Sequence, residues 1–330
     1  MLQYVGHMDQ IAGVKALQTA DGRGRDSRFF YVYTGGGLAF WVAIDRALDI
    51  VGCSYKGLSL AWNSPAGDVH PAYYEPEDAG WLRSFQGGMM TTCGLDQIGA
   101  PSQDDNQPYG LHGRISNLPA EQINYRTYWQ DDDYILEISG LIRQARLFGE
   151  NITLHRTITT QLGSNRVQIN DVVANVGFAP QPHLILYHFN LGFPLLDETA
   201  ELQLDAKESV PRDADAKAGF ANWRNLQPPT ADYREQVFRH IPNADADGNV
   251  NIELRNAKLG LGWRLVYNNE SLPHLFQWKM MGRGAYVLGV EPANSSGVEG
   301  RAVARQRDDL PILKPDEERY YALSFEVLTL

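Results

Sequence analysis

Residues 186–192 read Leu-Tyr-His-Phe-Asn-Leu-Gly. Successive side chains of a β-strand point to opposite faces, so this stretch would separate its apolar groups from its polar groups. One face would hold Tyr187, Phe189 and Leu191, and the other would hold His188 and Asn190. The sequence therefore predicts a strand that presents a single imidazole among apolar neighbours.

A second stretch, residues 286–292, reads Tyr-Val-Leu-Gly-Val-Glu-Pro. Alternation places Tyr286, Leu288 and Val290 on an apolar face and Glu291 on the opposite face. An imidazole and a carboxylate on facing strands would make a general acid and a general base. The alternative interpretation is structural, because a histidine in an apolar strand is often a hydrogen-bonded core residue and a glutamate at a strand end is often solvated.

The same period of two extends along most of the chain and is interrupted by turn residues, which is typical of antiparallel sheet. Residues 29–33 and 38–44 form a predicted hairpin around the glycines at 35–37. Further strands are expected at 134–138, 152–160, 167–176, 184–191, 259–267, 274–280, 286–291 and 320–328. Short helices are expected only near 75–85 and within 222–239, and no internal repeat suggests a propeller. We therefore predict an all-β fold, a large antiparallel β-sandwich.

Length and composition predict one large soluble domain. A chain of 330 residues can bury a sizeable core, and no linker-like segment divides it, so residues 1–330 are expected to form a single domain. No apolar run is long enough to span a bilayer, and the N-terminus lacks the pattern of a signal peptide. These features predict a cytoplasmic location.

Charge and motifs exclude several functions. The net charge of -11 argues against nucleic acid as a partner and is compatible with a neutral small molecule. Cys53 and Cys93 lack metal-site spacing and are expected to be buried free thiols. The segment 243–248 resembles a calcium loop, but Leu254 stands where the bidentate glutamate is required. We expect neither a metal nor a cofactor, and the oligomeric state is left open.

Three short motifs resemble the aldose 1-epimerase (galactose mutarotase) superfamily: Tyr-His-Phe-Asn-Leu at 187–191, Gly-Val-Glu-Pro at 289–292, and Leu-His-Gly at 111–113. A closer likeness, which extends over most of the chain, is to a bacterial branch of that superfamily known as a domain of unknown function. It lies in the segments 45–50, 87–95 and 111–114. The resemblance implies a supersandwich fold and a mutarotase, which opens and recloses a sugar ring by acid–base chemistry without a cofactor.

The resemblance also implies roles for individual residues. Glu291 stands at the family's base and His188 is the expected acid, although the family's histidine position holds Leu186 and its tyrosine position holds His188. His112 matches the family's first histidine motif, so it would bind the sugar near the ring oxygen, or would serve as the acid while His188 contacts the substrate. The family's mid-chain aspartate has no match, which leaves the identity of the sugar open.

Further substrate contacts are expected from polar residues on strand faces and loops. Gln277 and Lys279 share a face and would point either into the cleft of Glu291 or into solvent. The other candidates are Asn190, Arg83, Arg114 and His70. A second possible activity is an epimerase for a phosphorylated or otherwise anionic sugar, on which Arg83, Arg114 and Lys279 would converge. A third is a non-catalytic carbohydrate-binding sandwich.

Overall fold

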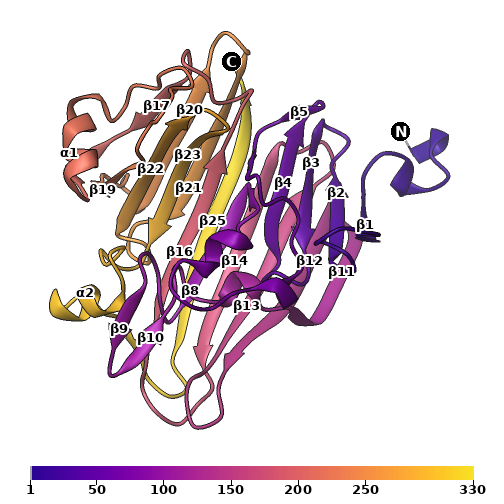
Figure 1. Ribbon diagram of the computed structural model, residues 1–330. Helices are drawn as coiled ribbons and strands as arrows, with labels where there is room; N and C mark the ends of the chain where they lie inside the picture. The colour runs from indigo at the N-terminus through magenta and orange to yellow at the C-terminus, as the bar shows by residue number, and fades with distance from the viewer. Residues whose placement is uncertain (1) are drawn as a thin grey trace.

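A computed structural model describes residues 2–330 and shows two large antiparallel sheets packed face to face (Figure 1). We call the 11-stranded sheet, which faces the viewer in Figure 1, the front sheet, and the eight-stranded sheet the back sheet. The predicted all-β sandwich is confirmed.

The front sheet runs in the order β1 (Gly13–Gln18), β2 (Arg28–Tyr33), β3 (Leu38–Ala43), β4 (Asp49–Tyr55), β8 (Met90–Leu95), β16 (Leu184–Leu191), β23 (Ala285–Ala293), β22 (His274–Gly282), β19 (Gln236–Pro242) and β18 (Ala206–Pro211), with β5 (Leu58–Ser59) paired to β4. The back sheet runs β11 (Ala120–Gln130), β12 (Asp133–Ala145), β13 (Asn151–Gln161), β14 (Arg166–Asn175), β25 (Glu318–Thr329), β21 (Leu261–Asn268), β20 (Asn249–Asn256) and β17 (Glu201–Leu204).

Short elements connect and cover the sheets. Three small pairs are β6 (Trp62–Asn63) with β7 (Gly87–Gly88), β9 (Ser102–Asp104) with β10 (Gln107–Tyr109), and β15 (Gln181–Pro182) with β24 (Ile312–Leu313). The helices are α1 (Ala214–Gly219), α2 (Arg301–Gln306) and the single 3₁₀ turns η1 (Leu2–Tyr4), η2 (Met8–Gln10), η3 (Pro71–Tyr73), η4 (Gly80–Arg83), η5 (Ile115–Asn117) and η6 (Phe220–Asn222).

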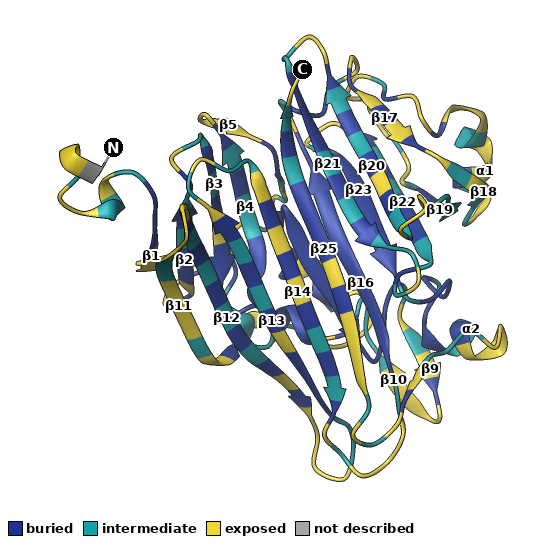
Figure 2. Ribbon diagram, turned by 180° about the vertical axis from the view of Figure 1, so that it is seen from behind, coloured by how far each residue is buried: buried dark blue, intermediate teal, exposed yellow. Residues whose placement is uncertain are grey.

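The two sheets differ in how their outer faces meet solvent. Strand β12 of the back sheet alternates buried and accessible residues, which gives the banding visible from behind in Figure 2. Strand β16 of the front sheet is buried at every position from Leu184 to Leu191, although its sequence alternates. The polar face of β16 is therefore covered by protein, and any chemistry of His188 takes place away from bulk water.

Two helices were expected. The one expected within 222–239 does not form, and the one expected near 75–85 is shorter than predicted. Between η6 and the start of β19 at Gln236 the chain is irregular, because Pro228 and Pro229 lack the backbone N–H groups that a helix requires. The helix of this region, α1, lies earlier, where Asp213 caps it by accepting a hydrogen bond from the Ala216 N–H. The segment near 75–85 forms only η4.

A buried polar cluster joins the sheets behind β16. Arg156 of β13 donates to Asp171 of β14 at 2.6 and 2.9 Å, and it donates to Asp49 of β4 at 3.0 Å. The Tyr187 hydroxyl donates to Asp171 at 2.8 Å, and Thr92 donates to Asp49 through its hydroxyl and its N–H. We call these five residues the Arg156 cluster. It ties β16 to the back sheet and so fixes the strand that carries His188.

Within residues 2–330 no helix has the length and apolarity needed to cross a membrane. Cys53 and Cys93 are both buried and unpaired, as predicted.

Candidate active site

His188 and Glu291 lie side by side on neighbouring strands. The antiparallel register of β16 and β23 pairs Phe189 with Val290, which brings His188 and Glu291 together on the face of the front sheet that points away from the back sheet. His188 Nε2 lies 3.2 Å from Glu291 Oε1, and the two side chains are 5% and 3% exposed. The sequence-predicted acid and base are thus in direct contact.

Gly289, two residues before Glu291 on the same face of β23, has to be small. A Cβ on Gly289 would collide with the carboxylate of Glu291 and would lie 2.8 Å from the Cβ of Trp278. Glycine at this position leaves room for the carboxylate to turn toward β16, a close approach of the kind that glycine in a strand often marks.

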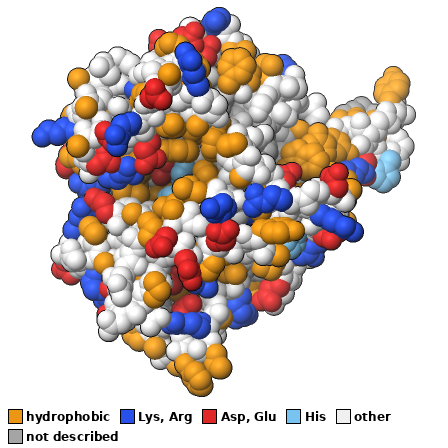
Figure 3. Space-filling model, viewed as in Figure 1, with side chains coloured by type: hydrophobic (Ala, Val, Ile, Leu, Met, Phe, Trp, Pro, Cys, Tyr) orange, Lys and Arg blue, Asp and Glu red, His pale blue; other side chains and the backbone are white. Residues whose placement is uncertain are grey.

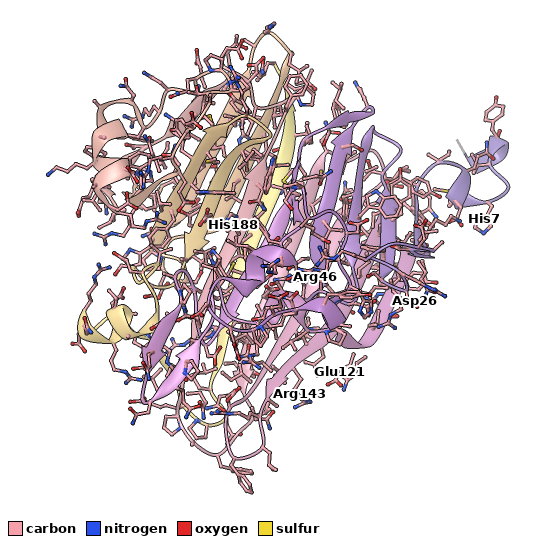
Figure 4. All side chains as sticks on the ribbon, viewed as in Figure 1. His7, Asp26, Arg46, Glu121, Arg143 and His188 are labelled. Atoms are coloured by element: carbon pink, nitrogen blue, oxygen red, sulfur yellow. The ribbon has the colours of Figure 1, made fainter. Side chains whose placement is uncertain are left out.

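A cavity of about 350 Å³ opens onto the pair. Figure 3 shows a hollow near the middle of the visible face, with hydrophobic side chains around a histidine, and Figure 4 shows His188 at the centre of the sheet. Besides the pair, the cavity is lined by Trp81, Leu82, Phe85, Gly99, Ala100, Pro101, Leu111, His112, Arg212, Glu235, Val237, Trp278 and Val298. An apolar cavity of this size with a few convergent polar groups is typical of a small-molecule site.

Two polar atoms of the pair have no hydrogen-bond partner, namely His188 Nδ1 and Glu291 Oε1. The 3.2 Å approach between the two side chains therefore lacks hydrogen-bond geometry. Because buried polar atoms in proteins are nearly always hydrogen-bonded, each such exception needs an explanation. A polar ligand in the cavity would supply it.

Burial controls the protonation of the pair. It raises the pKa of Glu291 well above its usual range, and the charge of Glu235 raises it further, whereas Arg212 lowers it. Burial also lowers the pKa of His188 well below its usual range, and the neighbouring His112 adds to this. Burial thus favours a neutral pair with the proton on Glu291.

His112 lies next to His188, but one of its ring nitrogens already has a hydrogen-bond partner. Its ring centroid is 5.6 Å from that of His188 and 4.7 Å from that of Trp81, and its backbone is left-handed with a φ of 57°. Its Nδ1 accepts a hydrogen bond from the Gly99 N–H at 3.3 Å, so the neutral ring carries its proton on Nε2 and can donate it. Burial lowers the pKa of His112 to about 4, which suits a neutral donor better than an acid.

Four predicted contacts lie outside the cavity lining. Arg83 pairs with Glu75 at 3.2 Å and is 70% exposed. Arg114 is exposed at the start of η5, and His70 caps η3 by accepting a hydrogen bond from the Ala72 N–H. Asn190 shares the face of His188, but its amide donates to the carbonyl oxygens of Gly88 and His188. None of these four side chains lines the cavity of the pair.

Gln277 and Lys279 point away from the cleft, so that prediction is wrong. The register of β22 with β23 pairs Phe276 with Glu291, which puts the odd-numbered neighbours of Phe276 on the opposite face. Gln277 donates to the Trp223 carbonyl and meets His240, and Lys279 donates to the Asn222 carbonyl. Both side chains are buried, so the solvent-facing alternative is wrong as well.

Arg212 and Glu235 line the cavity and were missed by the sequence analysis. Arg212 follows β18 and Glu235 precedes β19, and because these strands are paired, their ends meet at one side of the cavity. Arg212 donates to Glu235 at 3.0 Å and to Asp213 at 2.8 Å, and the Trp278 indole donates to Glu235 at 3.0 Å. No motif marks either residue, and the pairing of the two strands is the only signal that would have indicated them.

The described residues 2–330 contain no group of three or more His, Cys, Asp or Glu side chains placed to hold a metal ion.

Comparison with known proteins identifies one matching family and several solved structures that share the fold. The profile of a family described as a domain of unknown function, DUF4432, matches residues 24–327. A candidate aldose 1-epimerase from Klebsiella pneumoniae superposes with a TM-score of 0.91 at 26% identity, over 97% of this chain and 86% of that one. No match was found among the curated proteins.

Two more distant structures share the fold alone. The galactose 1-epimerase of Lactobacillus acidophilus has a TM-score of 0.59 at 14% identity, over 96% of this chain and 99% of that one. The GalM/aldose epimerase homologue of C. elegans has a TM-score of 0.58 at 13% identity, over 92% of this chain and 99% of that one. The galactose mutarotase-like fold expected from the sequence motifs is thereby confirmed.

Proposed function

The chain belongs to the DUF4432 family, and we propose that this member is an aldose 1-epimerase that interconverts the anomers of a neutral monosaccharide. The observation that carries the proposal is the contact of His188 with Glu291 at 3.2 Å, at the base of a cavity of about 350 Å³. The pair lies on the same fold as a galactose 1-epimerase. We also propose that residues 1–330 act as one domain, because each sheet draws strands from widely separated parts of the chain.

Mutarotation needs one base and one acid. Ring opening removes the proton of the anomeric hydroxyl and adds a proton to the ring oxygen, and reclosure after rotation about C1–C2 reverses both transfers. In the working form, ionised Glu291 takes the anomeric proton and protonated His188 gives a proton to the ring oxygen. Each group contributes roughly 10²- to 10⁴-fold when it is positioned in this way.

The pair holds one proton in total, so moving that proton from Glu291 to His188 produces the working form without exchange with solvent. Burial opposes the move because it penalises both charges. Sugar hydroxyls would solvate the charges, and Arg212 already favours ionised Glu291. In this proposal the neutral His112 donates its Nε2 proton to the bound sugar as a positioning contact.

The cations of the site favour a neutral sugar over an anionic one. Arg83, Arg114 and Lys279 do not converge, because Arg83 and Arg114 lie outside the cavity lining and Lys279 is on the opposite face of the sheet. Arg212 is the only lysine or arginine in the cavity lining, and it is already paired with Asp213 and Glu235. A binding module would have no use for a buried acid and base with unpartnered atoms.

Anomer-exchange NMR over a panel of neutral and phosphorylated aldoses tests the proposal. We expect the protein to accelerate exchange between the anomers of at least one neutral aldose above the buffer rate. Acceleration confined to phosphorylated sugars would support the anionic-sugar epimerase instead. Binding of a sugar without any acceleration would support the non-catalytic module.

A further inference from the structure

A second and larger cavity lies on the same outer face of the front sheet, over β1 to β4. Its volume is about 630 Å³, against about 350 Å³ for the active-site cavity. Its lining includes Phe29, Trp41, Gly52, Asn63, Asp68 and Gln86. None of these residues lines the cavity of His188 and Glu291.

The two cavities are lined by residues that are neighbours along the chain. Phe85 lines the active-site cavity and its neighbour Gln86 lines the second one. Trp62 of β6 packs against Phe85 and Trp278 with ring centroids 5.9 and 5.8 Å apart, while the adjacent Asn63 lines the second cavity. The second cavity is therefore an immediate neighbour of the proposed reaction site.

An aromatic platform forms one side of the second cavity. Alternation along β2 and β3 sends Phe30 and Phe40 into the core and leaves Phe29, Tyr31 and Trp41 on the outer face. The ring of Trp41 lies 4.7 Å from Tyr31 and 6.3 Å from Phe29, and Trp41 is 38% exposed. Figure 3 shows hydrophobic side chains gathered on this part of the surface.

The neighbouring strand keeps the platform open. Trp41 is paired with Gly52 of β4, and a Cβ on Gly52 would lie 3.2 Å from the indole. With no side chain on Gly52, the indole can approach the strand closely while Trp41 lines the cavity. The platform is not needed to fill the core, so its exposed face is available to a ligand.

Polar groups also line the second cavity. Gln86 is 5% exposed, and its Nε2 has no hydrogen-bond partner. Leaving such a buried donor unpaired is unfavourable, and a ligand oxygen could satisfy it. Asn63 and Asp68 add further hydrogen-bonding groups to the lining. No lysine, arginine or histidine lines the cavity, so it offers no charge partner for a phosphate or carboxylate.

We propose that this cavity binds the pyranose ring of a neutral saccharide, with the apolar face of the ring on Trp41 and its hydroxyls on Gln86, Asn63 and Asp68. An aromatic ring together with amide and carboxylate groups matches a pyranose, which is apolar across its ring faces and polar around its edge. The site requires no ring opening, so it goes beyond the proposed function and does not depend on it.

Methyl pyranosides are suitable probes because their anomeric oxygen carries a methyl group and has no proton to lose. We would titrate a panel of them into the ¹⁵N-labelled protein and follow the indole N–H resonances, with that of Trp41 identified by its absence in Trp41→Ala. At least one methyl pyranoside is expected to shift the Trp41 resonance. Trp41→Ala should weaken its affinity by roughly tenfold, as for truncation of an aromatic anchor.

Two further variants sharpen the test. Trp129→Ala, at a tryptophan of the back sheet that is 42% exposed, should leave the affinity unchanged. Gln86→Met keeps the shape but removes the unpartnered amide, so it should weaken binding severalfold without lowering the thermal stability. Equal affinity in Trp41→Ala and the wild type would overturn the inference, as would the absence of binding or tighter binding of nucleosides. Loss of binding in Glu291→Gln alone would assign the ligand to the active-site cavity.

Discussion

The two faces of β16 carry two buried groups of ionisable side chains that differ in their hydrogen bonding. Tyr187 points toward the Arg156 cluster, in which Arg156 donates to Asp171 and Asp49 and further donors complete both carboxylates. One residue along the chain, His188 points toward Glu291, where Nδ1 and Oε1 have no partner. Both groups are almost fully buried.

The difference separates a structural role from a chemical one. A completed network holds its members in one arrangement and in one charge state, which rigidifies the core. An incomplete pair keeps hydrogen-bonding capacity and a movable proton for a ligand, at a cost in stability. Neighbouring residues of a single strand thus serve opposite purposes, and each purpose can be tested by substitution.

The largest effect on the free energy of unfolding is expected in the Arg156 cluster. Arg156→Met leaves Asp49 and Asp171 buried without a cation, and removing one partner from a buried ion pair typically costs about 3–5 kcal/mol in the free energy of unfolding. Urea denaturation at pH 7 measures this. Arg126→Met is the matched control, since Arg126 pairs with Glu137 at 2.7 Å but is 56% exposed, and its loss should lower the stability far less. Equal losses would remove the distinction between the two designs.

Two other buried histidines are hydrogen-bonded at both ring nitrogens. They should make the stability of the fold decrease at acidic pH. His183 meets the Leu95 carbonyl and the Tyr321 hydroxyl, and His240 meets Ser209 and Gln277. Burial lowers the pKa of each to about 4.

An unfolded histidine has a pKa near 6.5. The contribution of His183 and His240 to the free energy of unfolding is therefore fully present above pH 6.5 and is lost as the pH falls toward 4. The loss is at most about 3 kcal/mol each. Urea denaturation at pH 7 and at pH 5 should show the decline, and His240→Gln should reduce it. Substitution of the exposed His155 by Gln should leave the decline unchanged, and an equal reduction in both variants would contradict the assignment.

Glu291→Gln should separate activity from stability. The amide keeps the shape but cannot take a proton, so anomer exchange should fall roughly 10²-fold or more. Burial opposes ionisation of Glu291, so the substitution should preserve or raise the free energy of unfolding at pH 7. Asp171→Asn is the opposite case, because it breaks a completed network and should lower stability. Anomer exchange by NMR and urea denaturation measure the two properties; unchanged exchange in Glu291→Gln would assign the base elsewhere.

The smallest effect is expected at His112. His188→Asn should abolish most turnover and flatten the alkaline limb of the pH–rate profile, where the pair loses its shared proton. His112→Asn removes a single neutral donor, worth about 1 kcal/mol or roughly fivefold in KM, and should leave that limb in place. Steady-state rates from pH 5 to 10 distinguish the two. If His112→Asn abolishes the limb and His188→Asn only raises KM, the roles are reversed.

The alternation of single strands could be predicted because it is a local property of the chain. Strand β16 has the predicted bounds, Leu184–Leu191, and its Tyr187 and His188 lie on opposite faces as expected. The hairpin of β2 and β3 is also as predicted, with Phe30 and Phe40 in the core. A period of two follows from backbone geometry alone and needs no information about neighbouring strands.

Register between strands could not be predicted, and the error at Gln277 and Lys279 shows why. Their common face was evident from the sequence, but whether it coincides with the face of Glu291 depends on which residue pairs with Glu291. That residue is Phe276, and a shift by one position would have turned Gln277 into the cleft. Arg212 and Glu235 were missed because only the pairing of β18 with β19 brings them to the cavity.

The sequence by itself determined that His188 and Glu291 each stand on the polar face of an otherwise apolar strand, because side-chain direction alternates along any extended backbone. Only the tertiary structure decided that the two strands are neighbours, that Trp81, Phe85 and Trp278 line the cavity of the pair, and that burial favours its neutral form. Desolvation depends on every atom packed around a group, and those atoms come from segments far apart in the chain.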